Sequence, residues 1–413
     1  MTKRVFYIIS FILISIYCHA QSNNHLNFYI DNALRNSPLL RDYQNQLQSS
    51  QYDSLLIRAT YKPQVTGTTY NSYSPILKGV GYDEIITNGA NFSTLIGVNK
   101  QLPNKKLLNA QFQNIQIQNQ LITNTSAISE QDLKKMVIAQ YITAYGDLQQ
   151  LNFNRDINSS LSKEETILKK LTEKNVYKQV DYLAFLVTLQ QQSLLINQLS
   201  IQYQYDFANL NYLSGNLDTA FVLLDDPEIH LKPLPNITQS VFFRKFEIDS
   251  LALNNNRLLI DAAYQPVIHL FADGGYISSL AYKAYKNFGT SFGISASIPI
   301  YDGKQKKMQY SKLSIAEQTR ANYKDFFARQ YKQQIAQLTQ QLTAIDELIA
   351  AINNQVRYAD ALMVADAKLL QAGELRIADY VLAINNYLNS KNQLTQNTIN
   401  RLQLINQLNY WNR

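Results

Sequence analysis

The residues best suited to acid–base or metal chemistry are four histidines, and their spacing supports neither role. His19, His25, His230 and His269 are scattered, and no two are four residues apart, the spacing that places two ligands on one helix face. No GxSxG, P-loop or GxGxxG pattern occurs where a strand would meet a helix. We therefore expect no enzyme, no catalytic residue, no metal site and no cofactor.

Two acidic residues stand at equivalent positions, each shortly after a break in a helical pattern. Asp181 follows the break at 174–178, and Asp379 follows the break at 372–374. A carboxylate in the first turn of a helix complements the helix dipole, which stabilises the helix by about 0.3 to 1 kcal/mol. This structural role is the first interpretation of both residues, and the elements around them decide what else they could do.

The N-terminus, Met1–Ala20, has the pattern of a secretory signal peptide. Lys3 and Arg4 precede an apolar run that is shorter than the roughly 20 residues of a spanning helix, and small Ala20 suits cleavage. A membrane anchor and lipidation of Cys18 are the alternatives. Cleavage would remove the single cysteine and lower the formal net charge from +7 to +5. The other basic residues are dispersed, so nucleic-acid binding is not expected.

The chain repeats itself over about half its length. IRATYKP, from Ile57, reappears as IDAAYQP from Ile260, and GVNKQLP, which ends at Pro103, reappears as GISASIP, which ends at Pro299. Such a long period indicates two copies of one unit instead of a solenoid, whose repeats span roughly 20 to 50 residues. We expect a first repeat at 21–223, an exposed inter-repeat connection at 224–236 and a second repeat at 237–413.

Each repeat is predicted to contain a long helical hairpin. From Ile335 to Leu370 apolar residues recur at alternating spacings of three and four, with one polar exception at Asp366, and this pattern is a coiled-coil seam. The helix should begin near Lys304, after the turn formed by Asp302 and Gly303, and continue to Gly373, a length on the order of 100 Å. The first repeat matches it from about residue 104 to 173. Gly373 and Asn175 suit the positive φ of a helix C-terminal cap.

Before each hairpin the pattern changes to a period of two. Apolar residues alternate with small or polar ones, as in transmembrane barrel strands. The expected strands are Gln64–Ser74, Asn91–Leu102, Val267–Ile277 and Ser291–Ile300. Pro103 and Pro299 should mark the turns from strand to helix, since proline is poor inside either element. Because known single-chain barrels begin at eight strands, four strands must share a barrel with other copies, and three copies would supply twelve.

These features together resemble the TolC-like outer membrane efflux proteins over essentially the whole mature chain. The most specific segments are IPIYDGKQKKMQY, from Ile298 to Tyr310, and QAGELRIADYVLA, from Gln371 to Ala383. The resemblance implies a homotrimer with a twelve-stranded barrel in the outer membrane lipid and an α-helical barrel across the periplasm. It implies a passive exit duct for a tripartite efflux pump or a type I secretion system, with a periplasmic adaptor (membrane fusion) protein and an inner membrane pump as partners.

The resemblance also assigns roles to the hairpin tips, which would contact the adaptor. The candidate contacts are Asn175, Tyr177, Gly373, Glu374, Leu375 and Arg376, although they could simply turn the chain. In a trimer, Arg376 with Asp379 and Asp181 could also form a charged constriction that gates the channel, as charged rings do in other pores. The first tip lacks the usual glycine. An alternative for the whole chain is a periplasmic adaptor-like coiled-coil protein that never enters a membrane.

Overall fold

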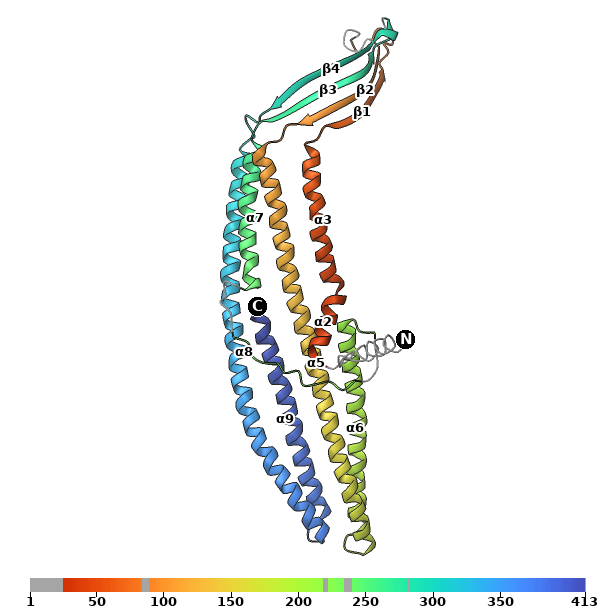
Figure 1. The fold of residues 1–413 in the computed structure, drawn as a ribbon, viewed down its shortest axis with the longest axis vertical. Helices are drawn as coiled ribbons and strands as arrows, with labels where there is room; N and C mark the ends of the chain where they lie inside the picture. Colours follow the sequence, from red (N-terminus) through yellow and green to blue (C-terminus); the bar gives the residue numbers. More distant parts are fainter. Residues whose placement is uncertain (1–24, 84–88, 218–221, 234–239, 281–282, 413) are drawn as a thin grey trace, which may run out of the picture. The chain divides into compact units, whose positions relative to one another are not determined.

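The computed structural model describes residues 25–83, 89–217, 222–233, 240–280 and 283–412. The expected signal peptide and Cys18 lie outside the described residues. The described residues fall into two compact units, and Figure 1 labels their helices and strands. Unit 1 comprises the described parts of Met1–Pro38, Ser129–Asn236 and Gln330–Arg413, and unit 2 those of Leu39–Ile128 and Ile237–Arg329.

The order of elements is the same in the two halves of the chain. A helix is followed by two strands and then by a pair of helices. In the first half these are α3 (Pro38–Thr60), β1 (Gln64–Tyr73), β2 (Ala90–Gln101), α5 (Lys105–Glu173) and α6 (Gln179–Ser214), preceded by α2 (Leu26–Asn36). In the second half they are α7 (Val241–Ala263), β3 (Val267–Ser278), β4 (Phe288–Ser297), α8 (Gln305–Ala372) and α9 (Ile377–Trp411), with the short 3₁₀ helix η2 (Ala284–Lys286) between the strands.

The mainly α fold with two strand pairs and two long helical hairpins is therefore confirmed. The predicted repeat boundaries are a separate matter and stay a prediction, because each compact unit combines segments from both halves of the sequence. Among the helices in the described part of the chain, none is both long and apolar enough to span a bilayer.

The four strands of unit 2 form one antiparallel sheet in the order β1-β2-β3-β4. The register pairs Val65 with Val98, Val98 with Ala272, and Ala272 with Phe292, so these four residues share one face of the sheet. The other face carries mainly polar side chains. The sheet is open at both edges, because β1 and β4 each pair with a single neighbour.

The expected end of the fourth strand was wrong by three residues. β4 stops at Ser297, whereas the alternating pattern had placed Ile298, Pro299 and Ile300 inside the strand. Proline has no N–H with which to continue a ladder. Ile300 is 97% exposed. The alternating pattern therefore continues past the end of the strand as exposed apolar surface.

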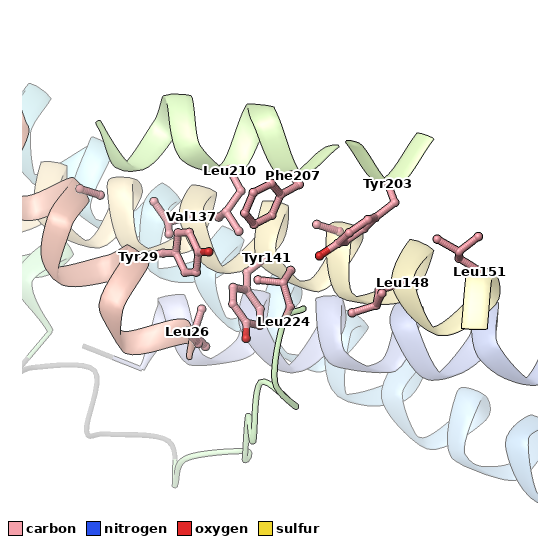
Figure 2. Close-up of a cluster of buried hydrophobic side chains, with 12 residues drawn as sticks. Leu26, Tyr29, Val137, Tyr141, Leu148, Leu151, Tyr203, Phe207, Leu210 and Leu224 are labelled. Atoms are coloured by element: carbon pink, nitrogen blue, oxygen red, sulfur yellow. The ribbon is translucent and has the colours of Figure 1, made fainter. Parts of the chain in front are cut away.

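Unit 1 has an aromatic core where α2 packs on the hairpin of α5 and α6 (Figure 2). The rings of Tyr29 and Tyr141 are 5.7 Å apart, and those of Tyr203 and Phe207 are 5.9 Å apart. On α6, Tyr203 and Leu210 are seven residues apart and therefore lie on the same face, and both are fully buried in this cluster. The tyrosines buried in this core carry hydroxyl groups, which require hydrogen-bond partners.

Those partners lie at, and just before, the start of the connection between the two halves of the chain. Tyr141 donates a hydrogen bond to the carbonyl of Asp225 at 2.8 Å, and Tyr203 donates to that of Val222 at 2.5 Å. Leu224 is 5% exposed within the same core. The prediction of an exposed connection is therefore wrong in part: hydroxyl groups that are buried in the core need acceptors, and this segment supplies them.

The coiled-coil seam on α8 is confirmed. Leu338 and Leu342 pack with Ile405 and Leu408 of α9, and the seam positions from Ile335 to Leu370 are all buried or half-buried. On the other side, α9 contacts α5 through side-chain amides that donate to backbone carbonyls. Gln403 donates to Ala139, and Asn406 donates to Lys135.

Candidate functional site

Two helical turns, at 174–178 and 373–376, form the candidate site, and both end a long helix in the same way. The residues with positive φ are Asn175 at 61° and Gly373 at 79°. The amide of the following residue bonds five positions back in each turn, from Val176 to the Leu171 carbonyl and from Glu374 to the Leu369 carbonyl. This is the Schellman pattern, and it confirms the predicted cap role of both residues.

The two turns contact each other directly. The hydroxyl group of Tyr177 lies 2.7 Å from the carbonyl oxygen of Leu370 and 2.9 Å from that of Leu375. Its single proton can therefore bond to the Leu370 carbonyl in the last turn of α8 or to the Leu375 carbonyl in the turn that follows. A Cβ at Gly373 would lie 2.8 Å from the side chain of Val176. The first turn thus both caps the second and fits closely against it.

Beneath the turns, one apolar core joins the ends of all four long helices. Phe185 of α6 stacks on Tyr380 of α9 with ring centroids 6.5 Å apart and planes 14° apart. Burial raises the pKa of Tyr380 to about 12, with a further contribution from the charges of Glu164 and Asp366. The fully or nearly fully buried members are Ile157, Leu161, Leu168, Tyr182, Phe185, Leu370, Ile377, Tyr380, Ile384 and Leu388. This core holds the two turns in a fixed register.

The charged residues of the turns lie on the surface above this core. Arg376 makes two hydrogen bonds of 2.8 Å to the carboxylate of Asp379, and its side chain is 83% exposed. Asp181 and Asp379 lie in the first turns of α6 and α9, whose N-cap residues Lys178 and Arg376 provide no side-chain cap. The geometry of both acids is therefore consistent with a carboxylate that stabilises the helix dipole. Their part in a charged constriction that gates the channel remains a prediction.

A second group of predicted residues belongs to unit 2 and turns the chain from strands to helices. Pro103 and Pro299 lie between a strand and a long helix. Asp302 caps α8 by accepting from the amides of Lys304 and Lys306, and Gly303 has a φ of 64°. A hydrogen bond from Tyr264 lowers the pKa of Asp302.

Some of the positioning residues are ones that the sequence reasoning missed. Asn104 caps α5 as Asp302 caps α8, because its side chain accepts from the amides of Lys106 and Leu107. An asparagine just before a helical pattern is a recognised cap signal, so this residue could have been found. Gly146 could also have been noticed, since it stands alone inside a long helix, although its role depends on Ile399 of another helix.

A pair of acids in unit 1, buried Asp206 and half-buried Asp147, had no detectable sequence signal. Asp206 of α6 is 7% exposed and accepts a 2.9 Å hydrogen bond from the amide of Gln140. Burial, together with a hydrogen bond and charge repulsion from Asp206, raises the pKa of Asp147 to about 7. The two acids are separated by 59 positions and meet only because α5 and α6 pack together. Among the described residues, no three His, Cys, Asp or Glu side chains form a potential metal cluster.

No protein-family model matches this chain, and no curated protein matches its sequence significantly. Solved structures do match. CusC, whose structures describe transmembrane channel formation, has a TM-score of 0.73 at 16% identity, over 95% of this chain and 92% of CusC.

Two further structures lead to the same class. The outer membrane protein VceC of Vibrio cholerae has a TM-score of 0.69 at 14% identity, over 94% of this chain and 96% of VceC. The MtrE outer membrane channel of Neisseria gonorrhoeae, in its open state, has a TM-score of 0.70 at 13% identity, over 94% of this chain and 88% of MtrE. This chain therefore has the fold of outer membrane channels, as the TolC-like resemblance predicted.

Proposed function

We propose that this protein is the outer membrane channel of a tripartite efflux pump or type I secretion system. In this proposal three copies place their four-stranded sheets side by side as a twelve-stranded barrel, and the helical hairpins continue the duct into the periplasm. The duct is passive, and partner proteins supply the energy for transport.

The observation that carries the proposal is the open sheet with one apolar face. β1 and β4 leave unpaired backbone groups at both edges, and such groups must find partners when water is excluded. Phe292 is 87% exposed and Ile294 73% exposed, a distribution that suits contact with lipid. Joining β4 of one copy to β1 of the next would satisfy both edges and place the polar face inside.

The polar face suits the wall of an aqueous channel. His269 lies 3.2 Å from the side-chain oxygen of Asn99, and Ser291 donates to Asp273 at 2.6 Å. These side chains hydrogen-bond to one another without ion pairing, so they can exchange bonds with water. Interiors of this kind are typical of transmembrane barrels that conduct solutes.

At the other functional end, we assign the turns at 174–178 and 373–376 to contact with a periplasmic adaptor protein. The register of the two turns supports this assignment, because Tyr177 and the shared core present them as one rigid surface. Glu374 and Arg376 are exposed on this surface. A rigid tip loses less entropy on binding than a flexible one.

The test is the molar mass of the protein extracted from the outer membrane fraction, corrected for detergent, followed by conductance in a planar bilayer. A trimer that forms pores is the expected result. A stable monomer, or release from the periplasm without detergent, would contradict the shared barrel and favour an adaptor-like protein.

A further inference from the structure

The lower end of the sheet in Figure 1, where all four strands join helices, is bordered by lysines. Because the strands are antiparallel, β1 and β3 begin and β2 and β4 end at this same edge. The exposed lysines nearest the four junctions are Lys62, Lys100, Lys105, Lys106, Lys304 and Lys307. We call this set the basic collar, and all of it belongs to unit 2.

The acids close to the basic collar are already bonded to other groups. Asp261 pairs with Lys306 at 2.9 Å, and Asp302 accepts a 2.6 Å hydrogen bond from Tyr264. The ion pairs found within the described residues do not include any lysine of the collar. A hydrogen bond from Tyr264 does not cancel the charge of Asp302, but the six lysines of the collar together with Lys306 outnumber these two carboxylates, so the region carries net positive charge.

The collar begins where the apolar face of the sheet ends. Lys100 pairs in register with Leu270, and Leu270 pairs with Ile294, so Lys100 emerges on the apolar face itself. Past the end of β4, the exposed apolar side chains of Ile298 and Ile300, which are 56% and 97% exposed, precede Lys304 in the chain. Lys304 and Lys307 share a shallow groove with Met308. Apolar surface next to a row of ammonium groups matches the chemistry of a phospholipid.

We propose that the basic collar binds the phosphate groups of anionic phospholipids while their acyl chains cover the adjoining apolar face. This inference rests on the proposed function, which places the sheet in a membrane. Long lysine side chains can lie along apolar surface and extend their charge to the headgroups. Each lysine close to an anionic membrane surface raises the affinity for that surface roughly fivefold.

The test uses the complete protein purified in detergent. Native mass spectrometry would follow lipid binding during titration with phosphatidylglycerol, with phosphatidylcholine of the same chains, and with inorganic phosphate alone. We expect phosphatidylglycerol to bind more tightly than phosphatidylcholine, and this preference to weaken at high salt. Inorganic phosphate should neither bind at comparable concentration nor compete, because it lacks acyl chains.

A triple substitution, Lys100→Gln with Lys304→Gln and Lys307→Gln, should lower the affinity for phosphatidylglycerol at least about tenfold. The matched control removes three exposed lysines of unit 1, Lys163, Lys169 and Lys170, by the same change to Gln. The control should bind phosphatidylglycerol as the unaltered protein does.

Equal binding of the two lipids, equal losses in the two triple variants, or full competition by inorganic phosphate would each overturn the inference. The same spectra report the number of copies per particle. A trimer without lipid preference would refute the collar and leave the proposed channel intact. A monomer would refute the channel itself.

Discussion

Substituting Gly146 should test the closest approach between α5 and α9. Gly146 stands inside α5, where an alanine would normally favour the helix by about 0.5 to 1 kcal/mol. Here, however, an added Cβ would lie 1.7 Å from Cδ1 and 2.9 Å from Cγ1 of Ile399. Carbon atoms prefer separations of about 3.5 to 4.0 Å, so Ile399 or a helix must move.

Overpacking of this kind costs about 1 to 3 kcal/mol. After subtracting the gain in helix propensity, Gly146→Ala should destabilise the protein by about 1 to 2 kcal/mol. In the Ile399→Val background the Cδ1 atom is absent and only the milder contact with Cγ1 remains. The same alanine should then be nearly neutral, which gives a coupling of at least about 1 kcal/mol between the two sites.

The measurement is thermal unfolding of the detergent-purified protein, followed by circular dichroism for both single variants and the double variant. Gly146→Ala alone should lower the Tm by roughly 1 to 3 °C. A neutral or raised Tm in the background that retains Ile399 would refute the reasoning. It would mean that α5 and α9 are not in close contact at this point.

Three further predictions concern the hairpins. Tyr177→Phe should lower stability by about 1 kcal/mol, because the carbonyls of Leu370 and Leu375 lose the hydroxyl donor. Limited proteolysis should then cut the turns faster, and equal cutting would show that the hydroxyl group does not hold them together. Gly373→Ala should cost about 1 to 2 kcal/mol from its left-handed backbone alone, measured by thermal unfolding beside Glu374→Ala as the control, and equal Tm values would contradict the cap. Because the pKa of Asp147 is raised to about 7, its contribution to stability is full below about pH 4 and is lost as the pH rises to about 7. In Asp147→Asn the free energy of unfolding should therefore decrease by about 1 to 2 kcal/mol less over this pH range, after allowance for solvent screening. If the free energies of unfolding of the two proteins differ by the same amount at every pH from 4 to 8, the raised pKa of Asp147 is refuted.

The elements of this fold could be predicted from sequence because their signals are local. The seam from Ile335 to Leu370 requires only the period of an α-helix, and an alternating segment such as 91–102 requires only the period of a strand. The positive φ of Gly373 and Asn175 follows from residue type. Local patterns also have a characteristic error: the alternation continued through Pro299, and the strand did not.

The contacts between elements could not be predicted in this way, because they join residues that are far apart in sequence. Tyr177 was predicted to lie at a tip, but its bond to the Leu370 carbonyl depends on how two hairpins pack. The same is true of Gly146 against Ile399 and of Asp147 beside Asp206. Packing between side chains of different helices brings these pairs together, and no periodic pattern in the sequence predicts that packing.

The sequence by itself therefore determined the order, length and polarity of the elements, and through them the class of fold. Only the tertiary structure decided which residues of the two tips hold each other and that the connection between the halves is buried at Leu224. It also decided that one sheet, and not two separate strand pairs, carries the apolar face. The physical reason is that periodicity records the surface each element must bury, whereas the partner of that surface is selected by packing in three dimensions.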